Sequence, residues 1–421
     1  VKANQQSTAE DDVEKLINQI SGLRISNRKS ILAYSSFALN FFRTASDAKS
    51  NFVYSPLSMG TALSMLMHGA RGKTKVQIKN LLCKGESIED LSAFFSNLIH
   101  AVSKSDASAI TAIIGEGVSI EKNYSENIEH GIRPDTKDVS TSTINTILVD
   151  KTSFFSVDQD FSALVESVFG AKIGTLAFKD PFGAANVVNS YVTQQTNNMI
   201  NQIVSESDFS DLSRAVLLSI TTFEAGWEFP FSEELTSKRT FKGINGNREE
   251  DFMYKDSAFN FYEDDEVTAL CLPYKDELFR FVAILPNGPF DGWLTSLSAE
   301  KLAAAMDRLQ REEIARAVVR LPKFSIDSTV GVKEAMEKLG VTDCFKPLEA
   351  DLTGMSKQPG LYVGDIFHKA FIDIDEKGTR AAGATVEGLI VLCPKPDLRF
   401  DRPFLYCIML GNVPLFIGQF V

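Results

Sequence analysis

Histidine is the side chain best suited to acid–base chemistry near neutral pH, and the chain has four: His68, His100, His130 and His368. No Ser or Cys stands at a recognisable catalytic spacing from any of them. The chain also lacks the G-x-S-x-G, H-E-x-x-H and G-x-G-x-x-G motifs. His368 begins the apolar part of DIFHKAFIDID, which favours a hydrogen-bonded structural histidine in a buried strand. The sequence therefore gives no positive support for an enzyme.

The segment HGARGKT (68–74) ends like a phosphate-binding loop. Such a loop needs a Gly where this chain has Met67, a strand before it and a helix after it. A helical pattern precedes the segment instead, so Gly69 and Gly72 are interpreted as helix-terminating residues. We predict no nucleotide site here.

The five cysteines are odd in number and widely spread: Cys83, Cys271, Cys344, Cys393 and Cys407. They form no C-x-x-C pair and no other metal-ligand spacing, so neither a metal nor a cofactor is predicted. Four of them are expected to be buried small apolar residues. Cys393 differs because its surroundings are polar and rich in Pro.

Composition narrows the class of protein. With 421 residues, 44% hydrophobic and 23% charged, the chain is typical of a soluble globular protein. Its net charge of −12 argues against a nucleic-acid partner, and no apolar run approaches the roughly 18 to 20 residues that span a membrane. The single N-x-S/T sequon, at Asn123, is a possible glycosylation site and fits a secreted protein, although an intracellular location stays open.

Periodicity predicts one large α+β domain with a helical N-terminal extension over residues 1–29. Helical patterns dominate the first hundred residues, and strand-like segments such as TINTILVD, AVLLSITTF and FRFVAILP dominate later. Residues 103–142 are polar and aperiodic, and we interpret them as a surface insertion. No linker and no internal repeat divides the chain.

The segment DEKGTRAAGAT (375–385) is unusual because its charged residues stop at Arg380 and only small residues follow. Taken alone, small residues of this kind favour a flexible surface loop. Its flanking segments decide otherwise. NFVYSPLSMGTALSMLMHGARGKT, TTFEAGWEFPF, LPKF, KLGVTDCF, HKAFIDIDEKGTRAAGAT and FDRPFLYCIMLGNVPLFIGQF, in this order and spacing, resemble the landmarks of the serpin family of protease inhibitors.

The resemblance covers the chain from about residue 30 and implies a single serpin domain over 30–421. It implies three β-sheets, roughly nine helices and an exposed reactive-centre loop at about 376–398. A target protease cleaves this loop, which then inserts as a strand into the main sheet and traps the acyl-enzyme. The resemblance thus implies an inhibitor, not an enzyme, that acts as a monomer on a serine protease.

The small residues acquire a function in this scheme as the hinge of the inserting loop. An inserting strand needs side chains that pass between two others without steric delay or desolvation of charge. Arg380 stands where the family usually has Glu, but alternation turns it outward if Thr379 faces inward. Glu387 falls on the inward face, where an unpaired carboxylate is costly. The hinge residues carried over from the family are Gly378, Thr379, Arg380, Ala381, Ala382, Gly383, Ala384 and Thr385.

Family spacing from Gly378 places the reactive bond between Leu392 and Cys393. Leu392 suits a chymotrypsin-like, cathepsin G-like or elastase-like specificity pocket. Lys395 or Arg399 suits a trypsin-like protease, but each lies too far along the loop for the usual length. Cys393 is interpreted as a tolerated small residue, with an oxidation-sensitive thiol as the alternative.

The family also places two serines, an Asn and a His under the main sheet, in a hydrogen-bonded cluster called the shutter, which controls sheet opening. Ser55, Ser58 and His368 match this pattern. The Asn position, eight residues before Trp227, is Ser219 here. Because Ser is shorter and has fewer donors than Asn, the network itself is expected to differ.

Two functional hypotheses follow from these residues. The Ala/Gly hinge favours an inhibitor of a chymotrypsin- or elastase-like protease, and Glu387 favours a non-inhibitory carrier, chaperone or storage protein. Heparin binding is not predicted, because ESIEDLSAFFSNLIHAVS lacks a basic face. The insertion and the N-terminal helix are interpreted as covering segments, with a partner surface as the alternative.

Overall fold

A computed structural model describes residues 27–83, 85–104, 139–151, 155–210, 212–276, 278–379 and 395–421. Several expectations fall outside these residues. They are the helical N-terminal extension up to residue 26, the sequon at Asn123, the hinge from Arg380 onward, Glu387, and the bond between Leu392 and Cys393.

A six-stranded sheet forms the centre of the molecule, and two of its inner strands, residues 215–226 and 363–374, run parallel and pair directly over part of their length. Its strands in spatial order are β10 (Phe324–Gly331), β11 (Val363–Ile374), β12 (Gly378–Thr379), β4 (Ala215–Gly226), β2 (Val139–Asp150) and β3 (Lys172–Leu176). All but one residue of β4 are buried, as expected for a central strand that is covered on both faces.

The other strands form a nine-stranded sheet that is bent along one long strand, β6 (Gly246–Glu263). Phe252–Phe259 of β6 pair with β9, whereas Asn260–Glu263 pair with β7. The expected three sheets are therefore present, and two of them share β6. The remaining strands are β1 (Phe52–Tyr54), β5 (Ser237–Gly243), β7 (Val267–Pro273), β8 (Phe279–Pro286), β9 (Ala315–Pro322), β13 (Asp397–Arg399), β14 (Phe404–Leu410) and β15 (Val413–Phe420).

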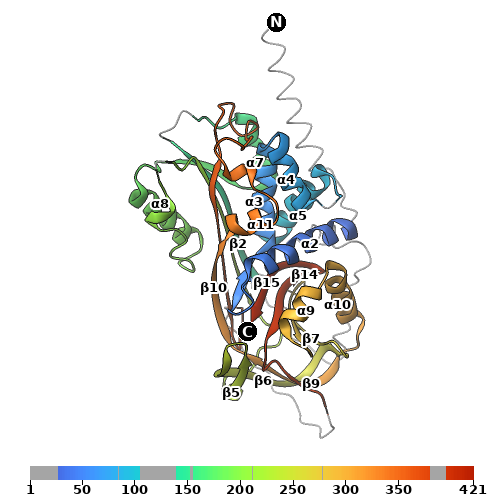
Figure 1. Ribbon diagram of the computed structural model, residues 1–421. Coiled ribbons are helices and arrows are strands. Elements are labelled where there is room, and N and C mark those ends of the chain that lie inside the picture. The colour runs from blue at the N-terminus through green and yellow to red at the C-terminus, as the bar shows by residue number, and fades with distance from the viewer. Residues whose placement is uncertain are drawn as a thin grey trace.

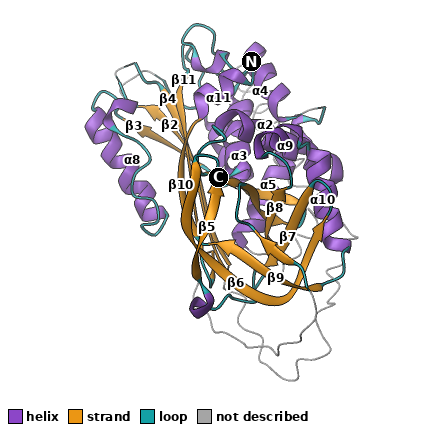
Figure 2. Ribbon diagram, turned by 60° about the horizontal axis from the view of Figure 1, so that its bottom comes forward, coloured by secondary structure: helices purple, strands orange, loops and turns teal. Residues whose placement is uncertain are grey.

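Nine α-helices occur in the described parts of the chain, which confirms the expected number. They are α2 (Asn27–Ala45), α3 (Pro56–Gly69), α4 (Gly72–Leu82), α5 (Ile88–Lys104), α7 (Gln159–Phe169), α8 (Pro181–Gln195), α9 (Phe290–Ser296), α10 (Ala299–Arg311) and α11 (Val332–Lys338). Figure 1 shows α8 alone on one side of the six-stranded sheet, and α3, α2 and α11 on the other. Figure 2 shows the same separation from a second direction.

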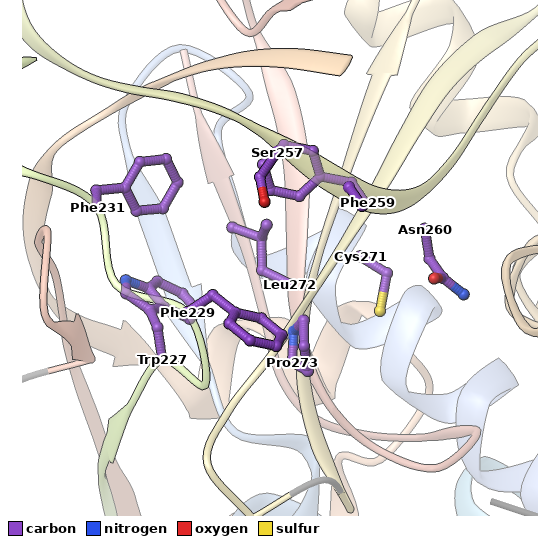
Figure 3. Close-up of a pocket in the computed structure, with 10 residues that line it drawn as sticks. Trp227, Phe229, Phe231, Ser257, Phe259, Asn260, Cys271, Leu272 and Pro273 are labelled. Carbon is purple, nitrogen blue, oxygen red and sulfur yellow. The ribbon is translucent and has the colours of Figure 1, made fainter. Parts of the chain in front are cut away.

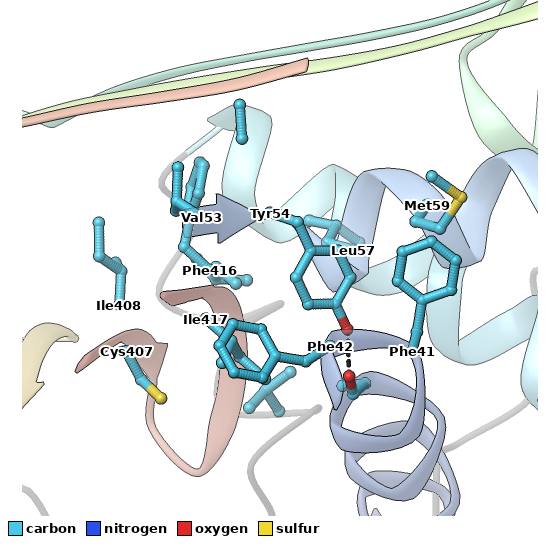
Figure 4. Packing of buried hydrophobic residues seen from close by; sticks show 14 of the residues in the cluster. Phe41, Phe42, Val53, Tyr54, Leu57, Met59, Cys407, Ile408, Phe416 and Ile417 are labelled. Atoms are coloured by element: carbon cyan, nitrogen blue, oxygen red, sulfur yellow. Dashed lines mark hydrogen bonds between the residues drawn. The ribbon is translucent and has the colours of Figure 1, made fainter. Parts of the chain in front are cut away.

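Helix α3 is buried along almost its whole length because it lies between the two sheets. Ser55 begins it by accepting a hydrogen bond from the backbone N–H of Ser58, and Pro56 occupies the first helical turn. The helix ends at Gly69, as expected, but Gly72 begins α4 with a φ of 50° instead of ending a helix. Tyr54, just before α3, donates a hydrogen bond to the carbonyl oxygen of Ala38 within the aromatic core (Figure 4).

Two boundaries differ from the sequence-based expectation. The expected insertion at 103–142 overlaps ordered elements, because α5 continues to Lys104 and β2 begins at Val139. Residues 139–142 are mostly polar, yet they pair with Thr222–Ala225 of β4. Pairing with the neighbouring strand, and not their hydrophobicity, therefore makes them part of β2. Helix α2 begins at Asn27, before the expected domain start at residue 30. The sequence did not indicate this earlier start, because the first turn of the helix is polar and its apolar pattern begins only at Ile31.

Candidate functional site

The start of the expected hinge lies between β4 and β11 of the six-stranded sheet. Gly378 and Thr379 form β12, which is antiparallel to β4 on one side and to β11 on the other. Gly378 has a φ of 151°, and a Cβ atom there would meet the carbonyl oxygen of Ala225 at 2.2 Å. A larger residue at 378 would therefore separate β12 from β4.

Thr379 faces the core. Its side chain is 0% exposed, and its hydroxyl lies 2.6 Å from the hydroxyl of Tyr274. Tyr274 stacks on Trp227 with ring centroids 4.7 Å apart, and burial raises the pKa of the Tyr274 phenol. The sequence analysis expected Arg380 to face outward if Thr379 faces inward, and Thr379 does face inward.

A tight turn leads into the hinge and is fastened to Trp227. The Asp375 carboxylate accepts hydrogen bonds from the backbone N–H groups of Lys377 (2.8 Å) and Gly378 (3.1 Å). The Trp227 indole N–H donates to the carbonyl oxygen of Asp375 at 2.8 Å, and its backbone N–H donates to that of Lys377 at 2.9 Å. This turn fixes the direction in which the chain enters the gap between β4 and β11.

The charged side chain of Glu376 also connects this turn to neighbouring segments. Its carboxylate accepts a hydrogen bond from the Lys323 ammonium (2.9 Å) and one from the Thr236 hydroxyl (2.7 Å), and its carbonyl oxygen accepts one from the backbone N–H of Phe231. Burial acts to raise the pKa of Glu376, but the hydrogen bonds from Lys323 and Thr236 outweigh it and hold this pKa below its usual value. Glu376 therefore stays ionised in the folded protein.

Further along, β4 and β11 pair directly, and the expected shutter residues meet under this part of the sheet. Ser219 of β4 lies opposite His368 of β11, and the Ser219 hydroxyl is 3.0 Å from His368 Nδ1. His368 Nε2 accepts the backbone N–H of Ser55 at 3.1 Å, so Nδ1 carries the proton and donates to Ser219. The Ser219 hydroxyl lies 2.8 Å from that of Ser58. All four side chains are 0% exposed.

Burial lowers the pKa of His368 to about 3, so the imidazole is neutral at physiological pH. This state is the one that its two hydrogen bonds require, because Nε2 must lack a proton to accept from Ser55. The expectation of a buried, hydrogen-bonded structural histidine is confirmed. No catalytic partner is needed to explain it.

Sequence reasoning did not find the fifth member of the cluster, Asn145. It lies on β2 directly opposite Ser219, and its Oδ1 accepts a hydrogen bond from the Ser58 hydroxyl at 3.3 Å. An amide is thus present beside Ser219 instead of at its position. The available signal was an Asn inside the apolar run INTILV, because a buried amide in a strand needs a partner.

The chain that follows the expected reactive bond is held against β6 and β9. Lys395 pairs with the carboxylate of Asp256, which also accepts a hydrogen bond from Arg316 at 3.0 Å. The hydrogen bond from Lys395 is the largest cause of the lowered pKa of Asp256. Arg399 lies within β13 and pairs with Asp397. Both basic alternatives for the reactive residue are therefore engaged in ion pairs.

The four cysteines within the described residues are buried and free: Cys83, Cys271, Cys344 and Cys407. This confirms their assignment as small apolar residues. In the described ranges, no helix is long and apolar enough to cross a membrane.

Comparison with known proteins agrees with this arrangement. The model of the family described as "Serpin (serine protease inhibitor)" matches residues 32–421. The leukocyte elastase inhibitor of Equus caballus is 27% identical over 403 residues, which cover 91% of this chain and 97% of that protein. A serine protease inhibitor of Cyanea capillata is 27% identical and covers 91% and 96%.

Solved structures give the same assignment. The native thermophilic serpin tengpin superposes with a TM-score of 0.78 at 25% identity, covering 96% of this chain and 97% of that one. Serpin48 of Tenebrio molitor has a TM-score of 0.72 at 28% identity, covering 94% and 99%. The chain belongs to the serpin family. It is thus a member of a family of protease inhibitors, not an enzyme.

Proposed function

We propose that this serpin is a suicide-substrate inhibitor of a chymotrypsin- or elastase-like serine protease, with its reactive bond between Leu392 and Cys393. The protease serine would attack the carbonyl carbon of Leu392, releasing the amino group of Cys393 and forming an ester with Leu392. Insertion of the loop before this ester is hydrolysed would trap the protease. The name of the Equus caballus relative, an elastase inhibitor, supports this protease class.

The observation that carries the proposal is the position of β12 between β4 and β11. Because β12 is antiparallel to both strands, the residues that follow it would continue into the gap without reversing direction. Extending the register of Thr379 brings Thr385 opposite both Ser219 and His368. A hydroxyl would then arrive where insertion breaks the bond between Ser219 and His368.

The same register explains Arg380. It would stand on the outer face of the sheet between Glu224 and Asp373, both of which are acidic. Opposite charges on adjacent strands stabilise a sheet, so the departure from the usual Glu fits this chain's own neighbours. Arg380 is in this proposal an electrostatic guide for the first step of insertion.

Contacts made by the residues that follow the proposed reactive bond favour cleavage after Leu392 over cleavage after Lys395 or Arg399. Cleavage after Lys395 would require its release from Asp256 and attack on the bond to Pro396. Cleavage after Arg399 would require opening β13, which pairs with β9. Leu392 needs neither change.

One experiment tests the proposal directly. The protein is incubated with chymotrypsin, elastase and trypsin, and each mixture is examined for an SDS-stable complex and for the released C-terminal peptide. We expect a complex with chymotrypsin or elastase and a peptide that begins at Cys393. Cleavage by every enzyme without a complex would overturn inhibition, and a peptide with another first residue would overturn only the assigned bond. A protease whose serine is blocked serves as the control.

A second function, that of a non-inhibitory serpin, is favoured by Glu387. The register of β12 would place its carboxylate on the inner face between Leu217 and Ile366, both of which are buried. An unpaired carboxylate there costs several kcal/mol and slows insertion. Glu387→Leu distinguishes the two functions. If the wild type is only cleaved and the variant forms a stable complex, the non-inhibitory function holds.

We also propose that the protein is secreted, on the basis of the sequon at Asn123. When eukaryotic cells express the protein, we expect to find it in the culture medium. Its electrophoretic mobility should shift after treatment with an N-glycosidase. Asn123→Gln should abolish that shift.

A further inference from the structure

Helix α4 carries a basic stripe on its exposed side. Arg71 stands just before its first residue, and Lys75 and Lys79 follow at intervals of four, so the three side chains lie along one flank of the helix. In the part of the chain that the structure describes, none of these three forms an ion pair. Lys73, on the other flank, pairs with Asp343 at 3.4 Å. Like charges four residues apart destabilise a helix, so the stripe favours an acidic partner from outside α4.

The charges around Lys75 show how little of this stripe is neutralised. The pKa of Lys75 is lowered first by burial and then by the charge of Arg71, and Lys79 acts in the same direction. Glu89 of α5 opposes them, as the one acidic group that acts on Lys75 among the described residues. The local charge is therefore positive, although the whole chain has a net charge of −12. Such a surface attracts a negatively charged segment.

An apolar side chain lies in the middle of the same exposed side. The buried residues of α4 are Thr74, Ile78, Leu81 and Leu82. Val76 points away from them, is 52% exposed and has lysines on both flanks. Phe229, which is also exposed, differs because it lines a cavity with Trp227 and Pro273 and so packs within its own surroundings (Figure 3). The exposed side of α4 therefore combines one apolar centre with basic flanks.

The N-terminal extension contains a segment of complementary pattern, AEDDVEKLINQI (9–20). Its apolar residues recur at helical spacing: Val13, Leu16, Ile17 and Ile20. Glu10 and Glu14 lie four residues apart beside this apolar stripe, at the same interval as Lys75 and Lys79. A helix of about 12 residues is marginal in water on its own, so its apolar side needs a surface to cover it.

Two parallel helices that face each other through their apolar sides bring these opposite charges together. The two glutamates then lie on the same flank as Lys75 and Lys79. Asp12 lies on the other flank, toward Lys73. An antiparallel helix would exchange the flanks and lose this match. Charge complementarity therefore favours the parallel arrangement.

The position at which the described chain begins permits the parallel arrangement. Helix α2 begins at Asn27, and the Lys29 ammonium lies 2.7 Å from a carboxylate oxygen of Glu86, shortly after the end of α4. The extension thus joins the described chain near the C-terminal end of α4. As a helix, residues 9–20 would be about 18 Å long, close to the roughly 16 Å of α4. Residues 21–26 would supply the connection.

We propose that residues 9–20 form an amphipathic helix that docks parallel to α4, with its apolar stripe over Val76. Glu10 and Glu14 would pair with Lys75 and Lys79. The occupant of this surface is thus a segment of the same chain. The proposal concerns neither the reactive loop nor inhibition, so its test stands apart from the proposed function.

Hydrogen exchange of the full-length protein, followed by mass spectrometry, measures the docking directly. We expect the backbone amides of residues 9–20 to exchange more slowly than those of an unstructured peptide of the same sequence. The double variant Lys75→Glu with Lys79→Glu should accelerate their exchange about tenfold, on the scale of two surface ion pairs. Adding Glu10→Lys with Glu14→Lys to this variant should restore slow exchange.

A matched pair of valines tests the apolar contact. Val76→Asp should accelerate exchange in residues 9–20, because it places a carboxylate opposite an apolar and acidic segment. Val187, on α8, is 57% exposed, so Val187→Asp is the control and should leave this exchange unchanged. Unchanged exchange in the peptides of β4 establishes that each variant keeps the fold.

Three results would overturn the proposal. The first is exchange of residues 9–20 in the wild type as fast as in the free peptide. The second is equally slow exchange in the wild type and in Lys75→Glu with Lys79→Glu, which would place the segment elsewhere. The third is protection that increases with protein concentration together with dimers in light scattering, which would assign the surface to a second copy of the chain.

Discussion

The same two strands, β4 and β11, are separated at one end of the central sheet and joined in the middle. At the hinge end, β12 lies between them and Thr379 already occupies an inward position. In the middle, Ser219 and His368 face each other and hydrogen-bond directly. The hinge end therefore requires only continued strand pairing, whereas the middle must first lose a buried hydrogen bond. In the proposed insertion, the shutter, and not the hinge end, would therefore resist opening.

The hinge end can be blocked by a charge on its inner face, and we expect this change to have the largest effect. Thr379→Arg would place a guanidinium beside Tyr274, in a site that is fully buried. Insertion should fail at its first step, so a protease would cleave the loop and leave. We expect SDS-stable complex to fall to background while cleavage at the reactive bond persists. Thr379→Val is the matched control, and undiminished complex in Thr379→Arg would show that insertion does not begin here.

The shutter can be broken at His368. His368→Ala removes the partner of Ser219 and of the Ser55 N–H and leaves a cavity, which should destabilise the uncleaved protein by about 2–4 kcal/mol. Urea unfolding measures the loss, and aggregation on mild heating reports easier opening. His100, which is exposed on α5, provides the control His100→Ala. Equal stability of the two variants would contradict the assigned role.

The pH dependence of this variant gives an independent reading. The folded pKa of His368 is about 3 and the unfolded value is near 6.5, so the unfolded chain binds the proton more readily. The neutral imidazole's contribution to stability is complete above pH 6.5 and declines as the pH falls toward 3. The wild type should therefore lose its advantage over His368→Ala across this interval. A constant difference between pH 7 and pH 4 would exclude a buried neutral imidazole.

The guiding role of Arg380 should have a smaller effect. Arg380→Glu would bring three acidic groups together on the outer face when the loop inserts, at Glu224, Asp373 and residue 380. We expect the ratio of complex to cleaved product to fall by about fivefold, on the scale of one cross-strand charge pair. The double variant Arg380→Glu with Glu224→Lys should recover most of the loss. If it does not, the register beyond Thr379 is not the one proposed.

The sequence predicts which residues form most of the shutter, but not the contacts that depend on strand register. Ser55, Ser58 and His368 were carried over from the family resemblance, and their hydrogen bonds are present. Asn145 was not predicted, because its contact depends on which residue of β2 lies opposite Ser219. The ion pair between Lys395 and Asp256 was missed for the same reason. Periodicity identifies a strand, but register and pairing arise only when distant strands come together.

The smallest effect is expected at Glu376, the charged attachment beside the hinge. Glu376→Gln keeps the shape of the side chain and removes the charge that Lys323 binds. Lys323 is 44% exposed, so solvent screens the pair and the loss should be about 1 kcal/mol. The folded pKa of Glu376 lies below the ordinary value of 4.5, so its stabilisation is present above pH 4.5 and is lost as the pH falls through the folded pKa. Urea unfolding at pH 7 and pH 3.5 should show a difference between wild type and variant that shrinks at the lower pH. A double-mutant cycle with Lys323→Met separates the pair from the bond to Thr236, and a coupling near zero would assign the stabilisation to Thr236 instead.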